Sequence, residues 1–231
     1  FNNILVTQTL SAGMEKLKPV LFPILAEVLR ADGQTIDGIY ERNDEALRAK
    51  EGLEQNKGWF ELSGETHPDS TQTEIRENGV YYHVDFENGQ KTGFFLDQKE
   101  NRHEVMKLCR GARVLDCFCH NGSFALNAAK GGAASVLGVD ISDDAIEVAR
   151  RNAENNGLSN VTFEARNCFD HLRELTDAKE KFDVVILDPP AFAKTRAAVE
   201  SALRGYKEIN LRGLKPVSYT HLRAHETPEH L

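Results

Sequence analysis

This sequence has no long apolar run. A membrane-spanning helix needs about 18–20 consecutive apolar residues, and the longest candidate stretch, residues 20–29, is interrupted by Pro23 and Glu27. The chain also shows no signal-peptide pattern, and it begins with Phe1 rather than Met. We therefore expect a piece of a longer cytoplasmic protein that has no membrane partner.

The sequence also has fewer basic than acidic residues. The 231 residues include 28 Lys and Arg against 36 Asp and Glu, which gives a formal net charge of -8. Proteins dedicated to binding nucleic-acid duplexes usually carry a basic excess. Any contact with nucleic acid must therefore rest on local patches or on segments outside this chain.

Cysteine is scarce, and its spacing does not suit a metal site. There are 4 cysteines, at positions 109, 117, 119 and 168. Cys117 and Cys119 lie close together, but no second close pair completes a zinc knuckle. We expect reduced thiols and no bound metal.

The first third of the chain combines one helix with a β-rich segment. Apolar residues recur every three or four positions between Ser11 and Arg30, which predicts a packing helix that Ser11 caps and Pro23 bends. Its predicted apolar face consists of Met14, Leu17, Leu21, Leu25, Val28 and Leu29. Asn78-Gly79 then separates two alternating segments, 74–76 and 80–86, as in a β-hairpin.

After Gly111 the chain alternates between strand and helix patterns. Strands are predicted at 113–116, 135–140, 161–164 and 182–188, with helices at 122–130 and 142–155. The last strand is a continuous apolar run, which is typical of a strand covered on both faces. This alternation predicts an α/β fold with a parallel, doubly wound, Rossmann-like sheet, preceded by the small β-rich domain.

Polar residues follow the predicted strands, where such sheets bind ligands. Asp140 ends the second strand and is placed to accept hydrogen bonds from ribose hydroxyls; a plain turn or capping role is the alternative. The turn after the first strand has a single glycine, Gly122, and lacks G-x-G-x-x-G. The sequence therefore favours a nucleoside cofactor without phosphates over a nicotinamide dinucleotide.

Asp188-Pro189-Pro190 forms a stiff exit from the fourth strand, because each proline fixes one φ angle and removes one donor. Such a loop can hold a carboxylate against a planar base, although a plain strand terminator is the alternative. Phe192 is either a stacking residue or an ordinary buried aromatic. The basic residues that follow would contact phosphates or form a solvated helix face. They are Lys194, Arg196, Arg204, Lys207 and Arg212.

These segments resemble known motifs. VLDCFCHNG at 114–122, GVD at 138–140 and LDPP at 187–190 look like motifs I, II and IV of class I methyltransferases. GQKTGFFLDQKENR at 89–102 and RGYKEIN at 204–210 sharpen the match. Together they resemble the bacterial large-subunit ribosomal RNA cytosine-5 methyltransferase family, from about Gln8 to Leu214.

The resemblance implies a domain order and a cofactor, S-adenosylmethionine. Residues 1–34 would be the end of an N-terminal PUA domain and a linker helix, 35–93 a central β-rich domain, and 94–215 an incomplete catalytic domain. The implied cofactor-binding residues are Lys91, Thr92, Phe95, Asp97, Gln98, Asp116, Phe118, His120, Gly122, Asp140, Ile141, Asn167 and Asp188. Many class I enzymes carry glycine where this chain has Phe118 and His120.

The implied reaction methylates carbon 5 of a cytosine in large-subunit ribosomal RNA. A cysteine thiolate adds to carbon 6, carbon 5 attacks the sulfonium methyl group, and a base then removes the carbon 5 proton. Asp188, Pro189 and Pro190 would face the target base. The nucleophilic cysteine is expected beyond the chain end, so these 231 residues are expected to bind the cofactor weakly without turnover.

Two other functions stay open at this stage. Related guanine methyltransferases share the Lys-Thr-Gly-Phe-Phe stretch and the Asp-Pro-Pro motif, although the segment at 205–210 favours cytosine. The chain is alternatively a cofactor-binding or RNA-binding module without catalysis. The sequence names neither the target nucleotide nor an oligomeric state.

The last residues, 216–231, depart from the family pattern. They resemble translated sequencing-adapter read-through, so we expect a non-native tail that packs poorly. Three histidines in it, His221, His225 and His230, suggest a metal site only weakly.

Overall fold

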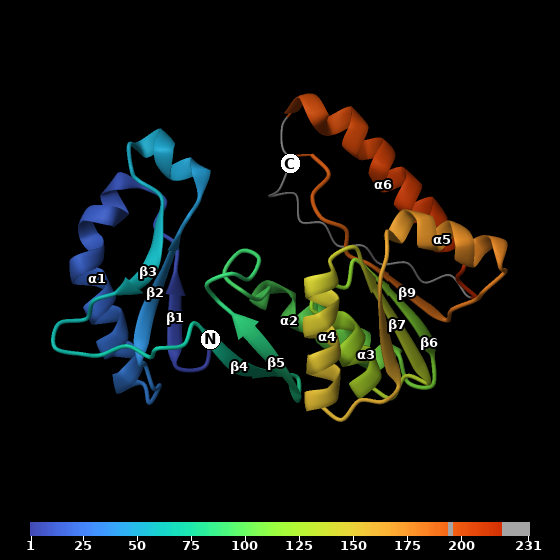
Figure 1. Ribbon diagram of the computed structural model, residues 1–231, viewed down its shortest axis with the longest axis horizontal. Helices are drawn as coiled ribbons and strands as arrows, with labels where there is room; N and C mark the ends of the chain where they lie inside the picture. The colour runs from blue at the N-terminus through green and yellow to red at the C-terminus, as the bar shows by residue number, and fades with distance from the viewer. Residues whose placement is uncertain (194–195, 219–231) are drawn as a thin grey trace. The chain divides into compact units, whose positions relative to one another are not determined.

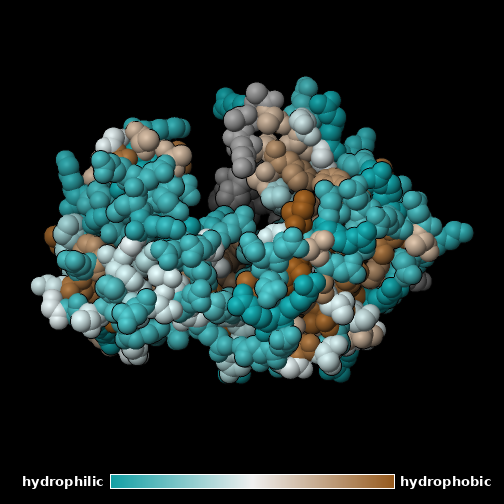
Figure 2. Space-filling model, viewed as in Figure 1, coloured by the Kyte–Doolittle hydropathy of each residue, from teal (hydrophilic) through white to brown (hydrophobic). Residues whose placement is uncertain are grey.

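The computed structural model describes residues 1–193 and 196–218. The chain forms two compact units (Figure 1). The first consists of residues 1–76 and 82–97, and the second consists of residues 77–81 and the chain from Gln98 onward. Hydrophilic residues cover most of the visible surface of each unit (Figure 2). In the described part of the chain, no helix has the length and apolar content to cross a membrane.

The first unit is built on a sheet of three strands with the order β1-β2-β3. Strand β2 (Gly38–Asn43) pairs in parallel with β1 (Ile4–Thr7) and antiparallel with β3 (Asn56–Phe60). Segments 1–34 and 35–93, which the family resemblance assigns to two domains, thus both contribute strands to one sheet. A short 3₁₀ helix, η1 (Ala46–Glu51), follows β2.

Helix α1 (Ala12–Ala31) packs on this sheet and confirms the predicted helix. Ser11 caps its start, with the side-chain oxygen accepting the N–H of Met14 over 3.4 Å. The predicted packing face is wrong, however. Phe22 and Ala26 are the buried residues of α1, and they contact Ile39 and neighbouring residues in the core. Five of the six predicted face residues are exposed, namely Met14, Leu17, Leu21, Leu25 and Val28.

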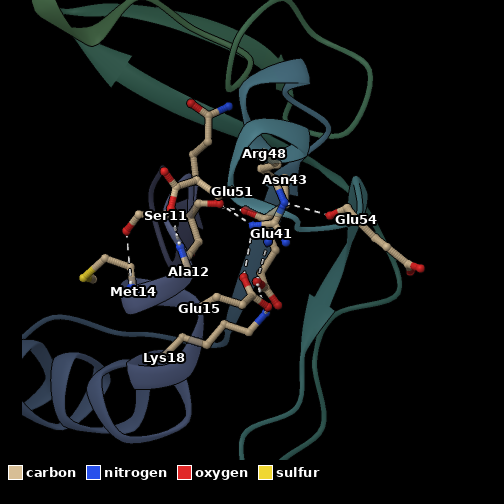
Figure 3. Close-up of polar contacts among 12 residues, drawn as sticks. Ser11, Ala12, Met14, Glu15, Lys18, Glu41, Asn43, Arg48, Glu51 and Glu54 are labelled. Carbon is tan, nitrogen blue, oxygen red and sulfur yellow. Dashed lines mark hydrogen bonds and ion pairs between the residues drawn. The ribbon is translucent and has the colours of Figure 1, made fainter.

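A buried polar network ties α1 to β2 and η1 (Figure 3). Glu41 accepts hydrogen bonds from Lys18 Nζ at 2.8 Å and from Asn43 Nδ2 at 2.6 Å. Arg48 Nη1 lies 3.0 Å from a carboxylate oxygen of Glu15. Because each charge has an opposite partner, the network tolerates burial that would be costly for a lone charge.

The predicted hairpin is present as β4 (Gln72–Glu77) and β5 (Val80–Asp85), with its turn at Asn78-Gly79. Its tip, residues 77–81, belongs to the second unit. There the carboxylate of Glu77 accepts two hydrogen bonds from Arg102, at 2.6 and 2.9 Å, and both side chains are almost fully buried. Asn156 also exchanges two hydrogen bonds with the backbone of Tyr81.

The second unit alternates strands and helices, as the sequence predicts. After the short 3₁₀ helix η2 (Leu96–Gln98), its elements are α2 (Lys99–Leu108), β6 (Arg113–Cys117), α3 (Ser123–Lys130), β7 (Ser135–Asp140), α4 (Asp143–Asn155), β8 (Val161–Ala165), α5 (Cys168–Asp177), β9 (Val184–Leu187), the short η3 (Arg196–Ala198) and α6 (Val199–Leu214). The strands are parallel, in the order β8-β7-β6-β9. This confirms the Rossmann-like class.

Helices cover both faces of this sheet (Figure 1). Leu172 of α5 and Ile209 of α6 join Leu115 and Val139 in one core cluster, while α3 and α4 lie on the opposite face (Figure 1). Ser142 caps α4 by accepting the N–H of Ala145 at 3.2 Å, as predicted. Strand β9 (VVIL) is thereby largely buried, which accounts for its apolar composition.

Strand β9 is shorter than the predicted strand 182–188. Phe182 instead forms an isolated parallel bridge with Val217, supported by hydrogen bonds to Pro216 and Ser218 at 2.8 and 2.7 Å. The first three residues of the expected tail therefore contact Phe182, which lies just before β9, without joining the sheet as a strand. Residues 219–231, including the three histidines, lie outside the described residues.

Candidate active site

The candidate site lies at the carboxyl ends of the strands in the second unit. The chain leaves β6 toward β7 on one side, and β9 returns on the other, so the strand order reverses between β6 and β9. Ligands of open α/β sheets bind at such a reversal. The strands are in register here, because Cys117 is opposite both Val139 and Leu187.

The loop after β6 has an unusual backbone. Phe118, His120 and Gly122 all adopt left-handed conformations, with φ of 63°, 49° and 80°. Positive φ is rare for a bulky residue such as phenylalanine. The two positions where related enzymes often carry glycine thus retain a glycine-like backbone despite their larger side chains.

Gly122 is required for a second reason besides its φ. A Cβ atom at this position would lie 2.8 Å from the ring of Phe163 and 3.0 Å from Cβ of Ala149. The same ring leaves no room for a Cβ at Gly138, which it would approach to 2.5 Å. The loop is therefore packed directly against β7, β8 and α4.

Asp140 connects two loops at the end of β7. Its Oδ2 accepts the N–H of His120 at 2.8 Å, and its Oδ1 accepts the N–H of Ser142 at 3.0 Å. Each carboxylate oxygen has more than one acceptor site, so both can accept a further donor. The half-buried carboxylate is thus oriented by backbone groups, as a receptor for ribose hydroxyls should be.

Asp116 is fully buried in β6. Its Oδ2 accepts the N–H of Ala125 at the start of α3, over 2.9 Å, whereas its buried Oδ1 has no hydrogen-bond partner among the described residues. Burial, reinforced by repulsion from Asp188, raises the pKa of this carboxyl well above its usual range. An unsatisfied buried carboxyl fits a cationic ligand group, such as the ammonium of an amino acid.

Cys168 is the site residue whose contacts the sequence did not predict. It is the first residue of α5, and its sulfur accepts the N–H of Phe118 at 3.2 Å and donates to the carbonyl of Val139 at 3.5 Å. The contact with Cys117 and the N–H of Phe118 lower the pKa of the Cys168 thiol despite its burial. No motif spacing reveals such a contact, because it joins residues 50 positions apart.

The other three cysteines are buried and lack this pattern. Burial raises the pKa of Cys109 to about 12, and it also raises the pKa of the Cys119 thiol. The hydrogen bond to Cys168 and burial raise the pKa of Cys117. A thiolate nucleophile needs exposure and a lowered pKa, so none of the three has the surroundings of a nucleophile.

The remaining predicted residues of this unit also lie at the strand ends. Asn167 caps α5, with its side-chain oxygen accepting the N–H groups of Phe169 and Asp170 at 2.9 and 3.3 Å. Ile141 is 70% exposed and is available to cover a ligand. Asp188 and Pro190 are exposed and Pro189 is half-buried, directly after β9.

An aromatic cluster follows the Asp-Pro-Pro loop. The rings of Phe192 and Tyr206 lie 4.5 Å apart, and the Tyr206 hydroxyl accepts the N–H of Phe192 at 3.1 Å. Gly205 makes this contact possible, because a Cβ there would lie 3.0 Å from the Phe192 ring. Phe192 is half-buried and packs against the core cluster that contains Ile209.

The basic residues near this loop differ in their surroundings. Arg196, Arg204 and Lys207 are exposed. Arg212 instead pairs with Glu208 at 2.5 Å and donates to the carbonyl of Phe169 at 2.8 Å, so it has a structural partner. Lys194 lies outside the described residues.

Four predicted cofactor-binding residues belong to the first unit, namely Lys91, Thr92, Phe95 and Asp97, while Gln98 belongs to the second. Within the first unit, the Lys91 ammonium lies 4.9 Å from the centroid of the Phe95 ring. Arg42 of β2 holds the preceding turn by donating to the carbonyls of Phe86 and Gly89 at 2.9 and 3.0 Å.

Comparison with known proteins gives a consistent set of relatives. A family model described as a methyltransferase domain matches residues 108–217. The ribosomal RNA large subunit methyltransferase I of Photobacterium profundum is 45% identical over 217 residues, which are 93% of this chain and 52% of that protein. That of Aeromonas salmonicida is 45% identical over 213 residues, covering 91% and 52%. The chain thus spans about half the length of these curated relatives.

Solved structures show the same fold. A SAM-dependent methyltransferase from Streptococcus mutans superposes with a TM-score of 0.73 at 24% identity, covering 94% of this chain and 52% of that one. A methyltransferase solved in complex with SAH gives a TM-score of 0.74, also at 24% identity, with 94% and 53% covered. At this identity the likeness establishes the fold alone.

Proposed function

We infer the function of this chain from its similarity to the ribosomal RNA large subunit methyltransferase I proteins, which it matches over about half of their length. We propose that it forms part of an S-adenosylmethionine-dependent enzyme that methylates carbon 5 of a cytosine in large-subunit ribosomal RNA. In the net reaction, the methyl group of the cofactor replaces the hydrogen on carbon 5, which leaves as a proton.

One observation carries the cofactor assignment. Two carboxyl groups, Asp116 and Asp140, lie near the carboxyl ends of the adjacent strands β6 and β7, one buried with an unsatisfied oxygen and one oriented by two backbone N–H groups. These features fit the ammonium and the ribose of S-adenosylmethionine, which supplies an activated methyl group when bound. A dinucleotide is a poor fit, since the loop lacks the glycines that let a pyrophosphate approach the backbone.

We assign the following roles as proposals. Asp116 binds the ammonium, Phe118, His120 and Gly122 shape the methionine end, and Asp140 binds the ribose. Ile141 and Asn167 contact the adenine. Asp188, Pro189 and Pro190 present the target base. The first-unit residues Lys91, Thr92, Phe95 and Asp97, together with Gln98, complete the set of cofactor-binding residues that the family resemblance implies.

A second candidate function is cofactor binding without turnover by these 231 residues. It is favoured by the burial of all four thiols, at 0–4% exposure, because cytosine methylation at carbon 5 requires a cysteine that reaches the base. We assign the nucleophile to none of the four.

Two measurements on the 231-residue chain test the proposal. Calorimetry should detect binding of S-adenosylhomocysteine and S-adenosylmethionine, whereas NADH should not bind. Transfer of a labelled methyl group to large-subunit ribosomal RNA should be absent or very slow for this chain. Failure to bind either adenosyl compound would overturn the cofactor assignment, and rapid methylation would overturn the binding-only candidate. Methylation of a guanine would overturn the proposed cytosine substrate.

A further inference from the structure

The two left-handed residues of the β6 loop that are not glycine are held in the same way. The N–H of His120 donates to the carboxylate of Asp140, and the N–H of Phe118 donates to the sulfur of Cys168. Asp140 ends the adjacent strand β7, and Cys168 follows β8, the strand on the far side of β7. Asp140 has a proposed ligand role, but the sequence analysis gave Cys168 none.

These two hydrogen bonds stabilise a backbone conformation that is unfavourable for residues other than glycine. A non-glycine residue held at positive φ costs about 1–3 kcal/mol and persists only where its surroundings determine the conformation. Phe118 has φ of 63° and a half-buried side chain. The backbone N–H of Phe118 needs a hydrogen-bond acceptor, and the Cys168 sulfur supplies one at 3.2 Å.

Cys168 is itself fixed in place. Its side chain is 3% exposed, its S–H donates to the carbonyl of Val139 at 3.5 Å, and Asn167 caps the helix it begins. The thiol therefore joins the loop after β6, the end of β7 and the start of α5. These three segments carry most of the proposed cofactor-binding residues of the second unit.

We propose that Cys168 is a positioning residue for the cofactor: its thiol holds the amide of Phe118, and with it the β6 loop, in the shape that binds the methionine end. The inference rests on the proposed function. It assigns no chemical step to the thiol, which touches the loop rather than the substrate.

The order of cofactor affinity among Cys168 variants distinguishes this role from simple packing. A serine hydroxyl can accept the Phe118 N–H and donate to Val139, whereas alanine and valine can do neither. If Cys168 only fills an apolar site, alanine and valine should be tolerated better than serine, because burying a hydroxyl there is costly and burying a methyl group is not. Cys109 offers a matched control, because it is a fully buried thiol of the same unit that ends α2, outside the cofactor loops.

Calorimetry with S-adenosylhomocysteine measures the functional consequence. We expect Cys168→Ser to bind within about threefold of the parent chain, and Cys168→Ala and Cys168→Val to bind about tenfold more weakly, equivalent to ~1.4 kcal/mol. Cys109→Ala should bind like the parent. Equal binding by Cys168→Ala, or better binding by Cys168→Val than by Cys168→Ser, would overturn the inference.

Amide exchange tests the restraint without any ligand. With ¹⁵N-phenylalanine labelling, the Phe118 amide should exchange about tenfold faster in Cys168→Ala than in Cys168→Ser, and Cys109→Ala should leave it unchanged. Unchanged exchange in Cys168→Ala would refute the hydrogen bond. If the parent chain bound no adenosyl compound, the proposed function would fail, and the exchange rates would still decide whether Cys168 restrains the loop.

Discussion

The backbone N–H of His120 and the Oδ2 atom of Asp140 form a 2.8 Å hydrogen bond that joins the tips of two adjacent parallel strands. The same carboxylate also accepts the N–H of Ser142. Asp140 therefore shapes the loop that follows β6 as well as offering oxygen atoms to a ligand. A substitution here removes both contributions at once.

Asp140→Asn should weaken S-adenosylhomocysteine binding by about 10- to 100-fold, since hydrogen bonds to a charged group contribute about 1.5–3 kcal/mol. The amide nitrogen that replaces one carboxylate oxygen cannot accept an N–H. Calorimetry measures the loss, and Asp144→Asn is the matched control, because Asp144 is exposed in the first turn of α4. Equal binding by the two variants would contradict the ribose role.

Asp116→Asn should make the stability of the unliganded protein less sensitive to a rise in pH. The pKa of Asp116 is raised in the folded state, so its stabilising effect is complete below the unfolded pKa and is lost as the pH rises toward the folded pKa. Asparagine does not titrate. The melting temperature of the variant minus that of the parent should therefore increase from about pH 5 to about pH 8.

The same variant should bind S-adenosylmethionine more weakly, because an amide, unlike a carboxyl, cannot lose a proton and offer the ammonium an opposite charge. Asp177→Asn, at the exposed end of α5, serves as the control for removal of one carboxylate. A melting-temperature difference that stays constant with pH would argue against a protonated Asp116.

Gly122→Ala should destabilise the protein by about 2–4 kcal/mol, since it combines positive-φ strain with a clash against Phe163. Gly132→Ala separates the two effects. Gly132 has a similar φ of 88°, but nothing lies within 4 Å of the position its Cβ would occupy. We expect Gly132→Ala to cost about 1–2 kcal/mol in denaturant unfolding. Equal losses would show that the contact with Phe163 is unimportant.

Arg42→Lys should loosen the turn that precedes Lys91 in the first unit. Lysine cannot donate to the carbonyls of Phe86 and Gly89 while also pairing with Asp44, as the guanidinium of Arg42 does. The amides of Gly89 and Gly93 should exchange about tenfold faster.

Arg48→Lys is the control for Arg42→Lys. Arg48 is a similarly buried arginine of the first unit that donates to the carbonyls of Thr9 and Glu54. Its replacement should leave exchange of the Gly89 and Gly93 amides unchanged. Comparable acceleration in both variants would point to general destabilisation rather than a local clamp.

The α/β class and several helix starts could be predicted from the sequence because they depend on local signals. Apolar runs followed by polar turns predicted the parallel strands. Ser11 and Ser142 cap the helices that they were expected to cap. Asp140 was placed correctly at the end of β7, since a strand that is buried on both sides ends where polar residues begin.

Other features depend on tertiary contacts that no local pattern contains. Helix α1 has apolar residues at helical spacing on two sides, so periodicity alone cannot decide that Phe22 and Ala26 pack on the sheet. Strand β9 begins its regular pairing with β6 at Val184, whereas Phe182 forms an isolated bridge with Val217, far along the chain. The Cys168–Phe118 contact likewise exists only once β6 and α5 are adjacent.

Glu77 at the hairpin tip pairs with Arg102, and this ion pair limits where the methyltransferase domain can be separated from the rest of the chain. A polypeptide started at residue 94, where the family resemblance places the start of the methyltransferase domain, would lack Glu77, the carboxylate that pairs with the guanidinium of Arg102. Breaking such a pair typically costs about 3–5 kcal/mol, a large fraction of the stability of a single domain. Anyone excising or transplanting the methyltransferase domain should therefore cut before β4 and carry the whole hairpin along.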